Sequence, residues 1–275
     1  MRWRSRKTGP GLAERTQDIA VTLICWLYFT LGFLLFFLPF YLVAFFFSSR
    51  PEDAFQRYNR NFYRGFITLL RCLTPRQQWS IDPRIASLRS AVIVCNHLSY
   101  LDPLLLIALL DRCKTVVKPI FFSLPLFAWV IRTAGYFPAS AQGRWAGLML
   151  TQMERMGAYL ADGGNLFIFP EGTRSRDGGI GALNKGALKI ARQCRAPVYV
   201  LCLRATDRLF RPGTFFFSTR EPIHISIRVI DHIPPLQDAD SLEELTNRIR
   251  TALESCREGK MHEMEPINPA MEPQQ

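Results

Sequence analysis

Residues 19–49 contain no charged side chain, and this apolar stretch limits what the chain can fold into more than any other feature. As one helix rising about 1.5 Å per residue it would measure about 46 Å, which exceeds a hydrocarbon core of about 30 Å. The stretch is too long for a secretory signal peptide, so we predict a retained membrane anchor. A single span and a helical hairpin bent near Gly32 and Pro39 both stay open, and a helix buried in a protein core is the alternative.

Basic residues lie on both sides of this anchor, where they suit anionic lipid headgroups. The two groups are nearly equal in number, so the positive-inside rule does not set the orientation. Residues 1–18 form a basic N-terminal segment. Residues 50–83 form an amphipathic helix and linker, which we expect at the bilayer surface because apolar side chains recur at helical spacing with arginines between them. Those apolar side chains are Phe55, Tyr58, Phe62, Phe66, Leu69, Leu70 and Leu73.

Helical and β-prone segments alternate after Pro83, which predicts an α/β catalytic domain over residues 84–258. A capping box at Ser241 begins the closing helix, which runs to about Arg257. The alternation from His224 to Ile230 is typical of a half-exposed or edge strand. Residues 259–275 are polar and Pro-rich, and we expect disorder there. The other expected strands are 91–95, 114–118, 165–169 and 197–203, and the other expected helices lie near 103–111, 125–134, 143–161 and 184–194.

Charge and cysteine content narrow the possible partners. The chain has 34 Lys and Arg against 23 Asp and Glu, a net charge of +11 that favours anionic partners. Nucleic acid is disfavoured, because the basic residues flank apolar helices and no nucleic-acid-binding module is recognisable. The seven cysteines include no C-x-x-C pair, so we predict small buried hydrophobic residues in a reducing compartment and no metal site. We place the domain on the cytoplasmic side of a membrane.

Two polar strings each follow a short apolar run, at the point where a buried strand should open into a loop. The first string is Asn96-His97-Leu98-Ser99-Tyr100-Leu101-Asp102, and the second is Phe169-Pro170-Glu171-Gly172-Thr173-Arg174-Ser175. The carboxyl ends of strands are where α/β sheets place their chemistry. Together the two strings indicate a base and an anion holder.

The first string can supply an oriented general base. Five residues turn a helix by about 500°, so His97 and Asp102 cannot share a helical face and must be joined through a loop. Pro103 suits the first helical position, which makes Asp102 or a neighbour the cap. Asp102 would accept from one ring nitrogen while the other takes a proton from an alcohol. The alternative is a helix cap beside an ordinary loop histidine; covalent catalysis through Ser99 or Cys95 is disfavoured, because each has a structural explanation.

The second string can hold an anion. Arg174 can bind a phosphate or carboxylate through two parallel bonds, and Gly172 lets the backbone approach that anion. Lys118, at the end of another strand, is a further candidate. The alternative is a surface turn with a solvated arginine. Convergence of His97, Lys118, Glu171 and Arg174 in space would distinguish the two interpretations.

These strings resemble the conserved blocks of the 1-acylglycerol-3-phosphate acyltransferase family of glycerolipid acyltransferases. Asn96, His97 and Asp102 match its N-H-x4-D block, and residues 169–175 match its F-P-E-G-T-R-S block letter for letter. The resemblance spans residues 85–205 and implies a mixed α/β sheet flanked by helices, preceded by a membrane-embedded helical segment. It also includes Lys118 and Pro125 of a K-x6-P element, Gly135, and Ala196-Pro197-Val198.

The resemblance implies roles for individual residues. His97 would be the general base, Asp102 its orienting partner and Asn96 a supporting residue. Glu171, Gly172, Thr173, Arg174 and Lys118 would bind the acceptor, with the two cations on its phosphate. One departure is Ala141, which stands where the family usually has Arg. Arg144, about one helical turn further on, is the candidate to replace that charge.

We therefore expect a membrane-bound O-acyltransferase that moves a fatty acyl group from a thioester to the free hydroxyl of a lysolipid. The first choice of acceptor is 1-acylglycerol-3-phosphate, which would give phosphatidate in phospholipid biosynthesis. The acyl donor would be acyl-CoA or an acyl carrier protein, with no other cofactor. Two alternatives stay open: another acceptor, such as a lyso-aminolipid or lysophospholipid, and a lipid-binding protein without catalytic activity.

Overall fold

The computed structural model describes residues 12–139, 143–174 and 179–257, and at its centre lies a seven-stranded sheet. The strand order is β1-β7-β6-β2-β5-β3-β4, and every neighbouring pair is parallel except β6 with β7. The predicted mixed α/β sheet is therefore confirmed. The strands are β1 Gln78–Ile81, β2 Val92–Cys95, β3 Cys113–Val117, β4 Phe137–Pro138, β5 Asn165–Ile168, β6 Val198–Arg204 and β7 His224–Ile233.

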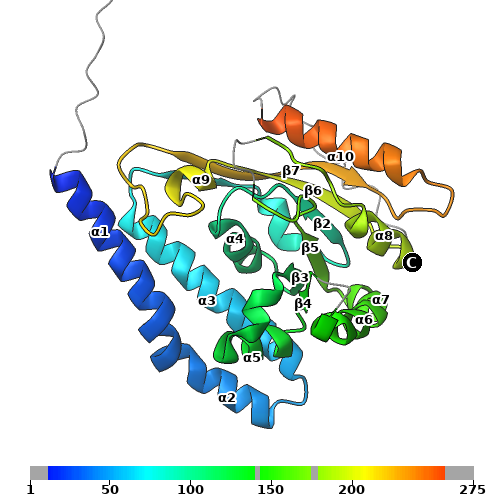
Figure 1. Cartoon of the computed structure of the whole chain (residues 1–275), viewed down its shortest axis with the longest axis horizontal. Coiled ribbons are helices and arrows are strands. Elements are labelled where there is room, and N and C mark those ends of the chain that lie inside the picture. Colours follow the sequence, from blue (N-terminus) through cyan, green and yellow to red (C-terminus); the bar gives the residue numbers. More distant parts are fainter. Residues whose placement is uncertain (1–11, 140–142, 175–178, 258–275) are drawn as a thin grey trace, which may run out of the picture.

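Helices cover both faces of this sheet (Figure 1). The core on one face joins β2, β6 and β7 to α3 (Pro51–Leu73) and α4 (Leu101–Leu109). The core on the other face joins the same strands to α8 (Gly186–Gln193) and α10 (Leu242–Arg257). The remaining helices of the domain are η2 Pro83–Ser87, η3 Pro119–Ser123, α5 Pro125–Thr133, η4 Gly143–Trp145, α6 Ala146–Glu154, α7 Met156–Ala161 and α9 Thr206–Leu209.

The parallel strands bring several loops to one edge of the sheet. β2 is parallel to β5 and to β6, and β5 is parallel to β3, so all four strands end at the same edge. The antiparallel β7 begins there, at His224. We call this the carboxyl edge. It receives both polar strings, because the first follows β2 and the second follows β5.

The N-terminal segment is helical without interruption from residue 12 to residue 47. It consists of α1 (Leu12–Leu27), the π-helix η1 (Tyr28–Phe37) and α2 (Leu38–Phe47). The chain reverses only after Phe47, so a hairpin within residues 19–49 is ruled out. Part of this helix, Thr16–Phe47, is long and apolar enough to cross a membrane by length and composition. Its outer side chains are exposed, up to 83% for Phe47, so it is not a helix buried in a protein core.

The apolar face of α3 packs inside the protein. Phe55, Phe62, Phe66 and Leu70 are each at most 4% exposed. Aromatic rings of the N-terminal helix cover part of this face: Tyr28 stacks on Phe62 with ring centroids 5.0 Å apart. The prediction that this face rests on the bilayer surface was wrong. The same periodicity suits a lipid surface and a protein core, and here the N-terminal helix and α4 form that core.

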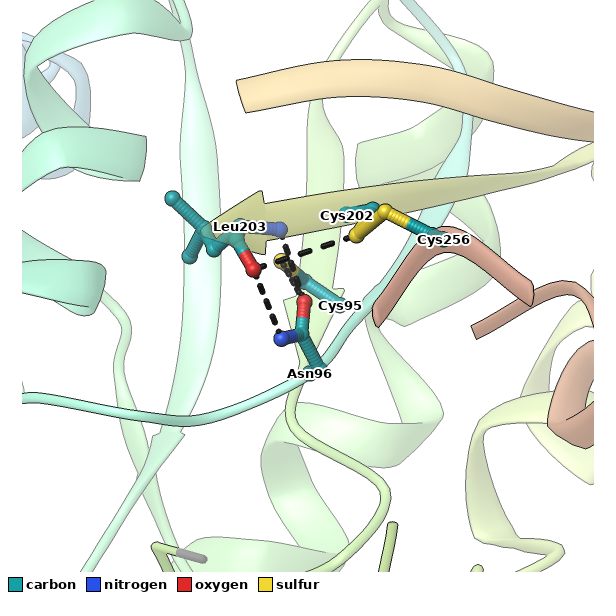
Figure 2. Close-up of a disulfide and its surroundings, with 5 residues drawn as sticks. All are labelled: Cys95, Asn96, Cys202, Leu203 and Cys256. Carbon is teal, nitrogen blue, oxygen red and sulfur yellow. Dashed lines mark hydrogen bonds between the residues drawn. A yellow bond between two sulfur atoms is a disulfide. The ribbon is translucent and has the colours of Figure 1, made fainter. Parts of the chain in front are cut away.

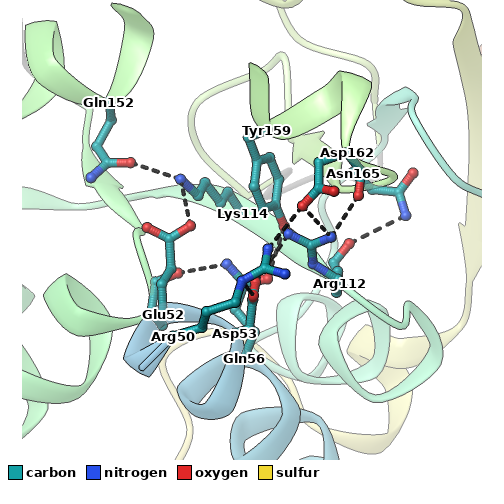
Figure 3. A network of polar contacts seen from close by, with 11 residues as sticks. Arg50, Glu52, Asp53, Gln56, Arg112, Lys114, Gln152, Tyr159, Asp162 and Asn165 are labelled. Carbon is teal, nitrogen blue, oxygen red and sulfur yellow. Dashed lines mark hydrogen bonds and ion pairs between the residues drawn. The ribbon is translucent and has the colours of Figure 1, made fainter. Parts of the chain in front are cut away.

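Ion pairs fix the start of α3 to the opposite, amino edge of the sheet (Figure 3). Lys114 of β3, 1% exposed, pairs with Glu52 at 2.8 Å and donates to Gln152 at 3.0 Å. Arg112 bridges Asp53 and Asp162, each at 3.0 Å. Buried charges of this kind need such partners. These ion pairs therefore attach α3 to the domain at the amino edge, away from the loops of the carboxyl edge.

Two local expectations need correction. The helix expected over 143–161 is divided into η4, α6 and α7. β7 is an interior strand, because the unpredicted strand β1 pairs along its outer side. Its polar positions His224 and Arg228 are exposed even so. The tail expected over 259–275 lies outside the described residues.

Two of the cysteines are not the free thiols that were predicted. Cys202 of β6 and Cys256 of α10 form a disulfide (Figure 2). Cys25, Cys95 and Cys113 are buried free thiols as predicted, whereas the free thiol of Cys72 is exposed. The pair lies 54 residues apart in sequence, so only the packing of α10 on the sheet brings the two sulfur atoms together.

Candidate active site

His97 lies in the loop after β2 and is held by two contacts. Its Nδ1 is 3.0 Å from Oδ2 of Asp102. Its ring stacks on Phe169, which follows β5, with centroids 4.1 Å apart and planes 18° from parallel. An ionised carboxylate only accepts hydrogen bonds, so we assign the hydrogen of the neutral imidazole to Nδ1. Nε2 then keeps the lone pair that a general base needs.

Asp102 is fully buried and accepts four hydrogen bonds. Oδ2 accepts from His97 and from the amides of Leu98 and Ser99, at 2.6 and 2.7 Å. Oδ1 accepts from Oγ1 of Thr206 at 2.6 Å. α4 begins at Leu101, so Asp102 belongs to its first turn, and Pro103 stands later than the first helical position where it was predicted. The carboxylate therefore both shapes the loop and orients the imidazole.

Glu171 joins the two strings directly. Its Oε1 accepts from the backbone amide of His97 at 3.1 Å, and its Oε2 accepts from the amide of Gly181 at 3.2 Å. The contact follows from the register, because β2 and β5 are neighbouring parallel strands. The Glu171 carboxylate thus holds the backbone of the first string at His97 and the backbone after the second string at Gly181.

Arg174 lies against the first string with an unsatisfied hydrogen-bond donor. Its guanidinium carbon is 3.5 Å from the centre of the Tyr100 ring. Nη1 is buried and has no hydrogen-bond partner among the described residues. Gly172 has φ +65°, a conformation that favours glycine, and no atom lies within 4 Å of the position a Cβ would take. Thr173 is exposed. The turn therefore presents a cation and open backbone to an anion.

Lys118 and Arg144 stand apart from this group. Lys118 is exposed after β3, which is separated from β2 by β5. Arg144 donates to the Ser123 hydroxyl and lies over the Trp145 ring at 4.7 Å. Among the described residues, the structure gives neither side chain a contact with His97 or Arg174. Ala141 lies outside the described residues.

Two residues and one contact at the site were missed by sequence reasoning. Thr206 completes the hydrogen bonds of Asp102 from α9, an element that the sequence did not indicate. The ring of Tyr100 makes a cation–π contact with the Arg174 guanidinium. The Asn96 amide donates to the Leu203 carbonyl at 2.9 Å and accepts from its amide at 2.7 Å, which fastens the start of the loop to β6 (Figure 2). Asn96 is thus a structural support for the loop.

Neither nucleophile considered for covalent catalysis is available. Burial raises the pKa of the Cys95 thiol well above its ordinary value, and the carboxylates of Asp102 and Glu171 raise it further. The thiol therefore stays protonated near neutral pH, and the thiolate is the reactive form. The Ser99 hydroxyl is fully buried and donates to the Phe210 carbonyl at 2.7 Å. This geometry favours direct transfer.

The family model described as Acyltransferase matches residues 80–204, a range that includes His97, Asp102, Glu171 and Arg174. Residues 80–204 are thus similar to the acyltransferase family. Curated relatives agree with that similarity. The chloroplastic 1-acyl-sn-glycerol-3-phosphate acyltransferase BAT2 of Brassica napus is 29% identical over 72% of this chain and 58% of its own length. The chloroplastic enzyme LPAT1 of Arabidopsis thaliana is 31% identical over 52% of this chain and 39% of its own length.

The fold also has a counterpart among solved structures. The 1-acyl-sn-glycerophosphate acyltransferase PlsC from Thermotoga maritima superposes with a TM-score of 0.68, covering 90% of this chain and 98% of that one. At 20% identity the likeness establishes the fold. The chain spans less than two thirds of the length of the curated relatives it matches.

Proposed function

We propose that this domain transfers a fatty acyl group from a thioester to the free hydroxyl of a lysolipid, with 1-acylglycerol-3-phosphate as the first choice of acceptor. The observation that carries the proposal is an oriented base in one loop and an unsatisfied cation that packs against the same loop. His97 is oriented by Asp102, and Arg174 lies over the ring of Tyr100, which stands between those two residues in sequence. A base alone would suit many hydrolases. A base near a turn whose arginine can bind a phosphate suits an alcohol that also carries a phosphate group.

In the proposed reaction, Nε2 of His97 removes the hydroxyl proton as the oxygen attacks the thioester carbonyl carbon. Asp102 holds the ring and stabilises the imidazolium that forms. Arg174 binds the acceptor phosphate, so the hydroxyl is presented at a fixed distance from the base. The acceptor and the donor thioester meet on the exposed side of the imidazole.

The charge that develops on the carbonyl oxygen needs a hydrogen-bond donor. The amides of His97, Leu98 and Ser99 already donate to Glu171 and Asp102, so these three amides are not free to serve as that donor. The backbone amide of Thr173 makes no hydrogen bond among the described residues and belongs to the turn that carries Glu171 and Arg174. We assign it as the candidate donor.

The N-terminal helix supports a membrane location for the acceptor. Asp18 of α1 accepts from the Thr219 amide at 2.9 Å and from Arg220 at 2.6 Å, in the segment between α9 and β7. Trp26 stacks on Phe215 of the same segment at 5.4 Å. The apolar helix is thus fixed next to a loop that leads to the carboxyl edge. We propose that it anchors the protein in the membrane, with the domain on the cytoplasmic side.

The test uses the full chain purified in detergent micelles. Acyl-CoA and acyl carrier protein thioesters are each offered with a panel of lysolipids, and products are identified by mass spectrometry. His97→Ala should lower turnover about 10³-fold, within the range for losing a general base, without changing the melting temperature. His232→Ala, on the far end of β7, is the matched control and should keep turnover.

The panel separates the alternatives. Phosphatidate formed fastest from 1-acylglycerol-3-phosphate supports the proposed acceptor, whereas faster acylation of a lyso-aminolipid or lysophospholipid replaces it. Lipid binding without consumption of any thioester would show a non-catalytic lipid-binding protein. Full turnover by the His97 variant would refute the assignment of the base.

A further inference from the structure

A cavity of about 590 Å³ opens at the carboxyl edge beside the His97 loop. Asn96 and Leu98 line it, so it begins at the residues that flank the proposed base. Its size is within the range of small-molecule sites, roughly 300 to 1,000 Å³. The proposed reaction needs a place for the nonreacting part of the acyl donor, and this cavity adjoins the reacting loop.

Arginines form a large share of the residues that line the cavity. Arg204, Arg208, Arg228 and Arg257 all line it, together with His224, against a single lining carboxylate from Asp207. The four arginines come from the end of β6, from α9, from β7 and from the last residue of α10. Separate elements thus deliver their charges to one recess.

The register of the sheet explains why these side chains are uncovered. In the antiparallel pair β6–β7, Cys202 lies opposite Arg228 and Arg204 lies opposite Ser226, so all four share one face. Within the described residues, α10 packs on that face as far as Cys256, whose disulfide to Cys202 links the helix to the sheet. The sheet positions nearer the carboxyl edge therefore line a cavity instead of a core.

Three of these arginines have no anionic partner among the residues that the structure describes. Arg208 pairs with Glu221 at 3.1 Å. Within the described part of the chain, no carboxylate lies at ion-pair distance from Arg204, Arg228 or Arg257. Like charges gathered in one recess repel each other, and a bound anion removes that cost. The arginine fork also matches phosphate oxygens in pairs. A ligand with several phosphate groups would match this arrangement of donors.

We propose that this cavity binds the 3′-phosphoadenosine diphosphate portion of an acyl-CoA donor. The inference rests on the proposed function, because it places the donor of that reaction. Coenzyme A carries a 3′-phosphate and a diphosphate, enough negative charge to face three unpaired guanidinium groups. Its pantetheine arm would run past Leu98 to bring the thioester to His97. Acyl carrier protein has a single phosphodiester at the arm and docks through a protein surface, so a cavity lined by several arginines favours coenzyme A.

The experiment compares donor affinities of the purified full chain in micelles. The variants are Arg228→Gln and Arg257→Gln, with Arg76→Gln, an exposed and unpaired arginine of the turn after α3, as the matched control. Each cavity variant should raise KM for acyl-CoA at least tenfold and leave KM for the lysolipid unchanged. Dephospho-coenzyme A should bind the unmodified protein more weakly than coenzyme A, and this difference should shrink in the variants. The control should match the unmodified protein throughout.

Binding of coenzyme A, measured by isothermal titration calorimetry without turnover, separates the two proposals. Arginine-dependent binding in a protein that acylates no lysolipid would refute the proposed function and keep the cavity assignment. Acyl transfer with an unchanged KM for acyl-CoA in both variants would overturn the cavity assignment alone. A raised KM for acyl carrier protein thioesters with an unchanged KM for acyl-CoA would also overturn it, since the cavity would then serve the protein carrier.

Discussion

The hydroxyl of Thr206 donates to Oδ1 of Asp102 at 2.6 Å, while His97 contacts Oδ2 of the same carboxylate at 3.0 Å. Thr206 is fully buried and comes from α9, which follows β6 in the chain and lies on the far side of β2 from β5. The orientation of the proposed base thus depends on a residue more than a hundred positions away in sequence.

Thr206→Val tests this relationship with little change in volume. Loss of a hydrogen bond to a charged group is worth about 1.5 to 3 kcal/mol, so kcat should fall about tenfold or more. KM for both substrates should stay within about twofold, since a residue that only positions the base does not contact them. Thr206→Ser keeps the hydroxyl and should restore most of the rate. Equal losses in the Val and Ser variants would show that packing, not the hydroxyl, matters.

Substitutions of Arg174 and Arg144 should have different effects on KM for the acceptor. Arg174→Gln should raise KM for 1-acylglycerol-3-phosphate by about 10- to 100-fold, because the unsatisfied guanidinium is the proposed phosphate ligand. Arg144→Gln should change it by less than about threefold, because that side chain is engaged by Ser123 and Trp145. Steady-state kinetics at saturating acyl donor measures both. The reverse order would restore Arg144 as the substitute for the family arginine at 141.

Alkylation should separate the buried and exposed thiols. Since burial raises the pKa of the Cys95 thiol, iodoacetamide at pH 8 should leave Cys95 unmodified and turnover intact. Cys72, which is free and exposed, should react under the same conditions. Peptide mass spectrometry identifies the modified residues. Loss of turnover in step with modification of Cys95 would revive a covalent mechanism.

The disulfide should contribute mainly to stability. Closing a loop of 54 residues removes about 4 kcal/mol of chain entropy from the unfolded state in the simplest model. Cys256→Ser should lower the melting temperature under oxidising conditions, and a reducing agent should lower that of the unmodified protein to a similar value. Cys194→Ser, at a half-buried free thiol, is the control. Equal melting temperatures for the unmodified protein with and without reductant would mean that the bond adds no stability.

The outer face of the N-terminal helix should determine membrane binding. Leu35 and Phe36 are 65% and 67% exposed. Each arginine placed at the centre of a membrane helix costs about 3 kcal/mol, so Leu35→Arg with Phe36→Arg should move protein from the membrane pellet to the supernatant. Thr68→Arg, on the exposed polar face of α3, should leave the distribution unchanged. A double variant that sediments like the unmodified protein would place the membrane contact elsewhere.

The sequence was most informative where short-range patterns decide structure. The apolar runs before Asn96 and Phe169 correctly predicted strands that open into loops, and parallel pairing of β2 with β5 explains why Glu171 reaches the His97 amide. The face of α3 could not be predicted, because an amphipathic repeat does not distinguish lipid from protein. Thr206 was not predictable either, since nothing local to it signals a contact with Asp102.

The pairing of β7 with β6 and β1 determined the remaining features that the sequence did not predict. Cys202 and Arg228 reach the same face only because β7 runs antiparallel to β6, and the edge expected at β7 is covered by β1. The alternation from His224 to Ile230 was a true signal of a polar face. That face lines a cavity beyond the end of α10 and does not lie at the rim of the sheet.

The four donors gathered on Asp102 leave the His97 ring as the proton carrier of the proposed reaction. The imidazolium would return the hydroxyl proton to the sulfur that departs as the carbon–sulfur bond breaks. Ester and free thiol then appear together, and the medium neither gains nor loses acid. Hydrolysis of the same thioester would release an ionised fatty acid and acidify its surroundings.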